Sequence, residues 1–124
     1  MTTNDASDTI SIPPCTVTST FPLGDKTCEM LAFSKPNNDP VDVREVRLRG
    51  HADKASMNEA AFQYFRKYCN QMPAERGDVS IAFPDALDDF GRIQYARRYC
   101  GLWRYYYDGT VDGWGGPVRL IRLS

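Results

Sequence analysis

The sequence predicts an α+β fold, in which a single layer of mostly antiparallel sheet is packed by two amphipathic helices. Three observations lead to this prediction. Strand-like segments separated by turn formers fill the first fifty residues, one strongly amphipathic segment follows, and short apolar runs end the chain. The expected order of elements is β-β-β-α-β-α-β-β, which gives about six strands.

The length of 124 residues is typical of one domain. Residues 1–9 are small and polar, so we expect a mobile N-terminal arm there. We expect residues 10–124 to form a single α+β domain.

Three strands are expected in the N-terminal part. ISIPPCTVTSTF (10–21) is rich in β-branched residues, KTCEMLAFS (26–34) alternates, and the turn formers of 35–40 end it. VDVREVRLRG (41–50) is expected as the third strand, with a bulge where its apolar residues change face, near Arg44–Glu45.

The first helix is expected after Ser56, which fits a capping box with Glu59. Pro73 ends the helical pattern. At 100° per residue one arc is apolar, which indicates a helix packed on a core. The arc contains Met57, Ala61, Phe62, Phe65, Tyr68, Cys69 and Met72.

The C-terminal half is expected to alternate between strands and one more helix. DVSIAF (78–83) predicts a central strand, and 84–100 predicts a helix that begins at Pro84 and is ended by Gly101. LWRYYY (102–107) and VRLIRL (118–123) predict the last two strands. The segment between them is expected to be a glycine-rich loop.

Positive charge is concentrated at the C-terminal end. The whole chain has a formal net charge of −1 and a pI near 5.8, which does not indicate a nucleic-acid binder. Residues 90–124, however, carry six arginines and two aspartates, a local net charge of +4. All seven tyrosines lie at or after Tyr64.

A partner-binding surface is therefore predicted in this part of the chain, because tyrosine, tryptophan and arginine are enriched at interaction hot spots. On the expected second helix, the apolar arc is formed by Phe90, Ile93, Ala96 and Cys100, and Arg97 falls inside it. Arg98 is expected to face water. Arg92 lies on a third face with Tyr95 and Tyr99 and can pair with Asp88. In the following strand Tyr106 faces opposite to its neighbours. The predicted partner-binding residues are Arg92, Tyr95, Arg97, Tyr99, Trp103, Arg104 and Trp114.

Residues for catalysis or metal binding are sparse. The single histidine, His51, is expected to be structural. The four cysteines have no zinc-site spacing, so no metal and no cofactor are predicted. Cys15 and Cys28 lie on neighbouring expected strands and could approach each other, but a disulfide is disfavoured in a reducing compartment.

The sequence favours a small non-enzymatic binding protein of the reducing cytoplasm, with no membrane segment, that recognises a protein partner or a second copy of itself. A phage or viral accessory protein, an immunity-type protein and an assembly subunit all fit this size. The alternative is single-stranded RNA binding through arginine–phosphate and aromatic–base contacts. A second alternative is a small hydrolase or nuclease that uses His51 with nearby acids or Cys28.

Overall fold

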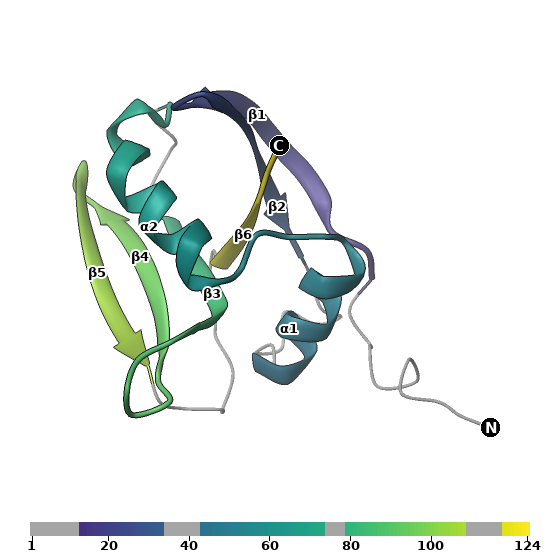
Figure 1. Ribbon diagram of the computed structural model, residues 1–124. Helices are drawn as coiled ribbons and strands as arrows, with labels where there is room; N and C mark the ends of the chain where they lie inside the picture. Colours follow the sequence, from purple (N-terminus) through teal and green to yellow (C-terminus); the bar gives the residue numbers. More distant parts are fainter. Residues whose placement is uncertain (1–12, 34–42, 74–78, 109–117) are drawn as a thin grey trace.

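The protein forms one six-stranded sheet with two α-helices, which confirms the predicted α+β class (Figure 1). The sheet order is β1-β2-β6-β3-β4-β5, and every neighbouring pair is antiparallel except β3 and β6. The computed structural model describes residues 13–33, 43–73, 79–108 and 118–124. Its elements are β1 (Thr16–Leu23), β2 (Lys26–Ala32), α1 (Val43–Ala52), α2 (Glu59–Tyr68), a 3-10 turn η3 (Cys69–Gln71), β3 (Val79–Leu87), β4 (Ile93–Tyr99), β5 (Leu102–Asp108) and β6 (Val118–Leu123).

The predicted order of elements was wrong at two places, and the first is the expected third strand at 41–50. This segment contains helix α1. Val46 and Gly50 are both buried, which is helical i,i+4 spacing rather than the alternation of a bulged strand. Glu45 in the first turn and Arg49 in the last turn complement the helix dipole.

The second error is the expected helix at 84–100. Pro84 is buried within β3, and the chain turns at Asp88–Arg92 and returns as β4. Phe90, assigned to the apolar arc, is 82% exposed in this turn. The segment after this turn is strand β4, which pairs with β3 and β5. Its side chains therefore alternate between the two faces of the sheet, and one of these faces lies against the core.

The first helix was predicted in the right place, with a different cap. The Asn58 side chain accepts a hydrogen bond from the Ala61 amide, 2.9 Å away, so Asn58 is the N-cap rather than Ser56. The hydroxyl of Ser56 instead accepts from the amide of Leu123 at 2.9 Å. Five residues of the predicted apolar arc are buried beneath or just after α2: Ala61, Phe62, Phe65, Cys69 and Met72. Tyr68 is half-buried, and Met57 precedes the helix and packs on the α1 side of the sheet instead.

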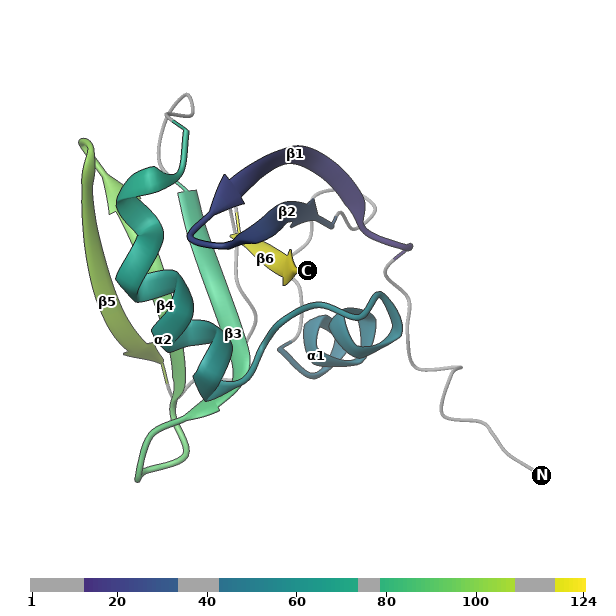
Figure 2. The ribbon, with the colours of Figure 1, turned by 45° about the horizontal axis from the view of Figure 1, so that its top comes forward.

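The two helices cover opposite faces of the sheet. The core beneath α2 contains Met30, Ile81 and Ile121. Their sequence neighbours Leu31, Ala82 and Leu120 belong to a second cluster that includes Val46 of α1. Because successive strand residues point to opposite faces, these clusters lie on the two sides of one sheet. In Figure 2, α2 lies beside β3, β4 and β5, and α1 lies below β6.

The chain passes from one face to the other where β3 and β6 separate. These two strands pair only at Ser80↔Val118 and Ile81↔Arg119. Beyond that point the α1–α2 connection lies between them. The Ser56 amide donates to the Ile121 carbonyl at 2.7 Å, and the Asp85 amide donates to the Met57 carbonyl at 3.0 Å. The connection therefore satisfies backbone groups of both strands.

No helix in the described part of the chain is long and apolar enough to cross a membrane. The predicted N-terminal arm, residues 1–9, lies outside the described residues.

Candidate binding surface

The hairpin β4–β5 carries most of the predicted partner-binding residues. Its turn is Cys100–Gly101, and both residues have positive φ, 53° and 81°. This is the conformation of a two-residue hairpin turn, whose twist matches that of the strands. Tyr99 pairs with Leu102 beside the turn, and the pairing continues to Ile93↔Asp108. Each strand therefore places alternate side chains on the two faces of the hairpin.

The face directed away from α2 is named the open face, because no described helix covers it. Tyr95 and Tyr106 stack across the strands with ring centroids 5.3 Å apart and an interplanar angle of 22°. Arg97 lies opposite Arg104, and both side chains are exposed. The open face consists of Tyr95, Arg97, Tyr99, Leu102, Arg104 and Tyr106.

A shallow hollow of about 300 Å³ lies in the middle of the open face. Its lining residues are Arg97, Tyr99, Arg104 and Tyr106. The Arg97 guanidinium lies over the Tyr99 ring, 5.7 Å from its centroid. Arg97 and Arg104 therefore place two guanidinium groups beside two tyrosine rings in this hollow.

Trp103 was predicted as a partner-binding residue, but it lies on the other side of the hairpin and is not part of the open face. Its ring packs edge-on against Phe65 of α2 at 5.1 Å. Tyr105, on the same side, packs edge-on against Phe62 at 5.9 Å. Burial raises the pKa of Tyr105, and its 3.2 Å contact with the Cys69 thiol raises it further. These aromatic rings belong to the core.

The neighbouring arginines also differ from their predicted positions. Arg97 was placed on the apolar arc of a helix and is instead exposed on a strand. Arg98 was expected to face water. It lies on the α2 side, where its guanidinium is 5.9 Å from the Trp103 ring centroid and donates to the Pro73 carbonyl.

Arg92 lies apart from the open face, in the turn between β3 and β4. Its Nε donates to Asp88 Oδ2 at 2.6 Å, so the predicted pair exists, although in a turn rather than a helix. The guanidinium lies over the rings of Phe90 and Tyr107, at 5.1 and 5.2 Å. Trp114 lies outside the described residues.

Leu102 and Tyr106 also lie on the open face, although neither was among the predicted partner-binding residues. Leu102 is 62% exposed and Tyr106 is 39% exposed. The alternation of LWRYYYD contains the signal, since it places these two residues with Arg104 and opposite to Trp103. It does not say which side is covered, because that depends on where α2 packs.

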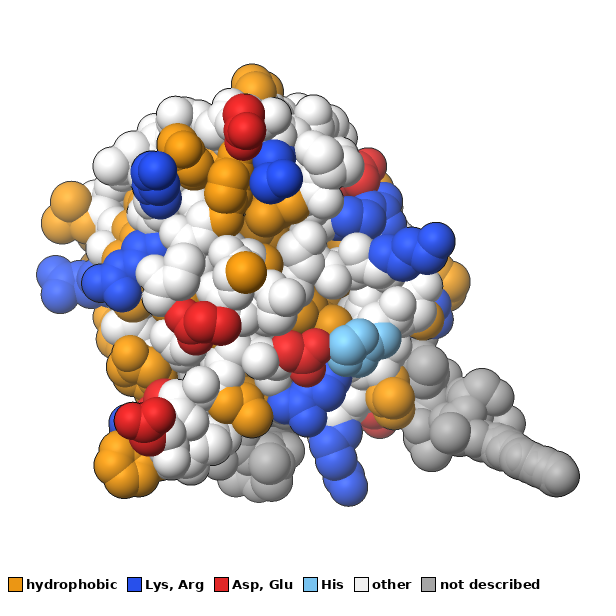
Figure 3. Space-filling model, viewed as in Figure 1, with side chains coloured by type: hydrophobic (Ala, Val, Ile, Leu, Met, Phe, Trp, Pro, Cys, Tyr) orange, Lys and Arg blue, Asp and Glu red, His pale blue; other side chains and the backbone are white. Residues whose placement is uncertain are grey.

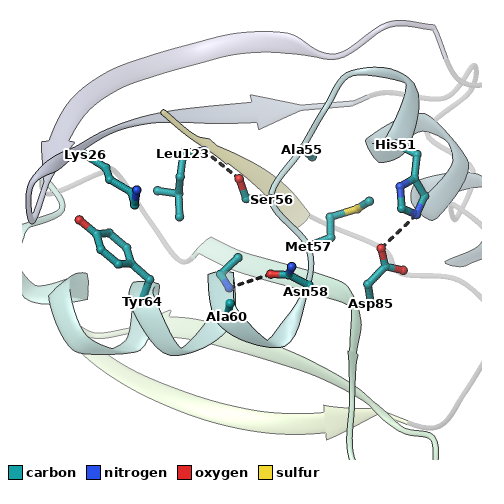
Figure 4. Close-up of a pocket in the computed structure, with 11 residues that line it drawn as sticks. Lys26, His51, Ala55, Ser56, Met57, Asn58, Ala60, Tyr64, Asp85 and Leu123 are labelled. Atoms are coloured by element: carbon teal, nitrogen blue, oxygen red, sulfur yellow. Dashed lines mark hydrogen bonds and ion pairs between the residues drawn. The ribbon is translucent and has the colours of Figure 1, made fainter.

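A second concave region, of about 550 Å³, lies where the α1–α2 connection passes between β3 and β6. Figure 4 shows Lys26 and Tyr64 at one end and His51 with Asp85 at the other. His51 is in the last turn of α1, not at a strand end, and its Nε2 lies 3.0 Å from Asp85 Oδ2. Figure 3 shows this histidine, in pale blue, at the surface beside an acid.

The polar groups around this cavity already have partners in the fold. Arg47 Nε lies 3.1 Å from Asp85 Oδ1, and Arg47 also donates to the Pro84 carbonyl at 2.7 Å. The Tyr64 hydroxyl lies 2.6 Å from the Leu23 carbonyl and 2.7 Å from Asp25 Oδ1. These contacts attach both helices to the sheet.

The four cysteines are free thiols. Burial raises the pKa of Cys28 to about 12, and the charge of Glu29 adds to the effect. Burial also raises the pKa of Cys15 to about 12, together with its contact with Asp53. Neither thiol has the lowered pKa of a nucleophile. Among the described residues there is no group of three or more metal-ligating side chains.

Comparisons with protein-family models, with curated proteins and with solved structures find no match to this chain.

Proposed function

We propose that this chain is a binding protein that recognises a protein partner through the open face of hairpin β4–β5. The observation that carries the proposal is the exposure of large side chains on one face of a paired hairpin: Tyr99 is 53% exposed, Leu102 62% and Tyr106 39%. Arg97 and Arg104 lie among them. Contiguous apolar surface that also presents tyrosine and arginine is characteristic of interaction sites.

A protein partner fits the charges better than a nucleic acid does. The whole chain has a net charge of −1, so its long-range field does not attract a polyanion. The open face itself carries two arginines, which suits one or two carboxylates at the centre of an interface. The proposed location is the reducing cytoplasm, which agrees with four free cysteines. The narrower contexts, an accessory, immunity-type or assembly protein, remain proposals of the same kind.

The test compares two double variants of equal charge change. Arg97→Glu with Arg104→Glu reverses the charge of the open face. The matched control, Lys54→Glu with Lys67→Glu, reverses two exposed lysines outside this face. Each immobilised protein is exposed to an extract of the cells that express it naturally, and the retained proteins are quantified by mass spectrometry.

The proposal expects a protein that is retained by the wild type and by the lysine variant and is lost from the arginine variant. Equal retention by all three proteins would contradict it. Circular dichroism must show that both variants remain folded. We expect this because all four substituted side chains are exposed.

Single-stranded nucleic acid is the second candidate, and the hollow lined by two arginines and two tyrosines favours it. If both arginines contact phosphates, the logarithm of the binding constant for a labelled oligouridine should fall with the logarithm of salt concentration, at a slope of about −1.4. The protein-recognition proposal expects no such binding at low salt.

The hydrolase or nuclease alternative rests on the His51–Asp85 contact. His51→Ala would abolish an activity without changing the melting temperature if the residue were catalytic. If His51 is structural, the same substitution should lower the melting temperature without abolishing an activity. We favour the structural role because Asp85 also binds Arg47 of the same helix and lies on β3, which α1 packs against.

A further inference from the structure

Strand β5 ends the sheet, and no other described strand pairs with its outer edge. A sheet edge without a neighbouring strand offers its outward amides and carbonyls to another strand. The edge is seven residues long, Leu102–Asp108. It contains one arginine and one aspartate, and its other side chains are apolar or aromatic. In Figure 1, β5 is the outermost strand on the left, and in Figure 3 basic and hydrophobic side chains gather along that side.

The hairpin turn determines which backbone groups face outward. In a two-residue hairpin, the residues that flank the turn form a hydrogen-bonded pair, and the pairs then alternate along the strands. Tyr99↔Leu102 is that first pair. Every second residue from Leu102 therefore bonds to β4. Trp103, Tyr105 and Tyr107 direct their amides and carbonyls away from β4, toward the free edge.

We infer that this edge pairs with the same edge of a second copy of the chain, in antiparallel orientation, around a two-fold axis at Tyr105. Tyr105 is the central residue of β5, so this register pairs all seven residues. The pairing joins two six-stranded sheets into one continuous sheet.

The side chains of β5 are complementary to each other in this register. Trp103 lies opposite Tyr107 of the second copy, which gives two aromatic cross-strand pairs. Arg104 lies opposite Tyr106 of the second copy, where a guanidinium can contact a tyrosine ring. Leu102 lies opposite Asp108. No two like charges face each other.

Other registers are less suited to pairing. A residue whose amide and carbonyl face the free edge must lie opposite such a residue of the second copy. In any other register, each residue therefore lies opposite a residue two positions further along the second copy, in one direction or the other. One such change puts Arg104 opposite Arg104 of the second copy, which is destabilising. A change in either direction also pairs only five residues of the seven. The seven-residue register is therefore the one that we assign.

The inference does not rest on the proposed partner, because it uses the backbone edge of β5 rather than the hollow of the open face. It adds one consequence. In the pair, the open faces of the two copies adjoin across the two β5 strands, which would make a surface of twice the width. Loss of pairing and loss of partner binding are measured separately, by mass and by retention.

The first test measures the mass of the full chain in solution by light scattering and by sedimentation over a dilution series. We expect twice the 14.0 kDa of one chain at high concentration, with dissociation on dilution. Tyr107→Pro removes one outward amide and blocks strand addition, yet leaves the bonds to β4. It should weaken pairing by about tenfold or more. The control, Tyr107→Ala, keeps the amide and should pair within about threefold of the wild type.

A wild-type chain that is monomeric at every concentration would overturn the inference. So would equal loss of pairing in both Tyr107 variants, since that would assign the contact to the side chain instead of the backbone.

If Tyr107→Pro does not fold, a cysteine test decides. In the assigned register, position 104 of one copy lies opposite position 106 of the other copy. The two form a non-hydrogen-bonded pair, whose short Cα–Cα distance accepts a disulfide. In a Cys100→Ser background, Arg104→Cys mixed with Tyr106→Cys should form a linked dimer of the two variants under mild oxidation. Either variant alone should form much less of the disulfide-linked dimer. Equal linkage in all three samples would exclude the assigned register.

Discussion

The two faces of hairpin β4–β5 have the same strands and similar residue types, yet they have different surroundings. On the α2 face, Trp103 and Tyr105 lie against the phenylalanines of α2. On the open face, Arg104 and Tyr106 face solvent. The difference is made by the helix and not by the strand, because adjacent residues of one YYY run lie on opposite sides. Aromatic content alone therefore does not separate core from binding surface.

The largest expected effect comes from breaking the covered face. Phe65 is fully buried and packs against Phe83 and Trp103 with ring centroids 5.8 and 5.1 Å apart. Phe65→Ala should lower the free energy of unfolding by about 3–5 kcal/mol. The control on the open face, Tyr99→Ala, should change it by less than about 0.5 kcal/mol, because Tyr99 is 53% exposed. Urea unfolding followed by tryptophan fluorescence measures both, and equal losses would contradict the assignment of the faces.

A medium effect is expected where α1 is held against the other half of the sheet. Asp53 receives 2.9–3.0 Å hydrogen bonds from Arg49 and from the Cys15 amide. Burial raises the pKa of Asp53, but these bonds and the contact with the Cys15 thiol lower it by more, so the net pKa is below the usual value. Asp53→Asn should cost about 1–2 kcal/mol at pH 7.

The pH dependence of this variant has a definite sign. Because the pKa of Asp53 is lower in the folded state, its carboxylate stabilises the fold above the ordinary pKa of about 4. This contribution is lost as the pH falls through the lowered value. The difference in melting temperature between wild type and Asp53→Asn should therefore narrow below about pH 4. A constant difference between pH 7 and pH 3 would show that the charge of Asp53 has no role.

The smallest change, with little effect on stability, concerns the thiols. Cys100 is exposed at the hairpin tip, whereas Cys28 and Cys69 are buried beneath α2. At pH 8 one thiol per native chain should react rapidly with a disulfide reagent, and Cys100→Ser should remove that reaction. All four should react after unfolding in urea. A second rapid thiol in the native chain would mean that the covered face opens readily.

The fold class could be predicted because hydrophobic period and turn residues are local signals. Helix α2 has an apolar arc that no strand would produce, and VRLIRL and LWRYYY are short runs rich in β-branched, aliphatic and aromatic residues, which favour strands. The two errors have a shared cause. In 41–50 and in 84–100 the apolar residues fit a period of two and a period of 3.6 about equally well. Tertiary packing decided between them, through the burial of Val46 beneath the sheet and the pairing of β4 between two strands.

The sequence indicated which segment carries the candidate surface, but not which of its residues share one face. Composition indicated the segment that forms the hairpin, and four of the seven predicted residues share the open face: Tyr95, Arg97, Tyr99 and Arg104. Trp103 was misassigned because strand alternation separates it from Arg104 without stating which side a helix covers. Arg92 was grouped with the tyrosines by helical angle, and that grouping was lost when the segment proved to be a turn and a strand.

The most direct measurement compares two adjacent tyrosines, Tyr105→Ala and Tyr106→Ala, for stability and for partner retention. Tyr105 contacts Phe62 and Cys69 on the α2 face, and Tyr106 lines the hollow of the open face. We predict that Tyr105→Ala lowers the free energy of unfolding by more than Tyr106→Ala does, since Tyr106 loses only its stacking on Tyr95. We predict that only Tyr106→Ala weakens retention of the partner. If Tyr106→Ala retains the partner as well as the wild type does, the open face is not the binding surface.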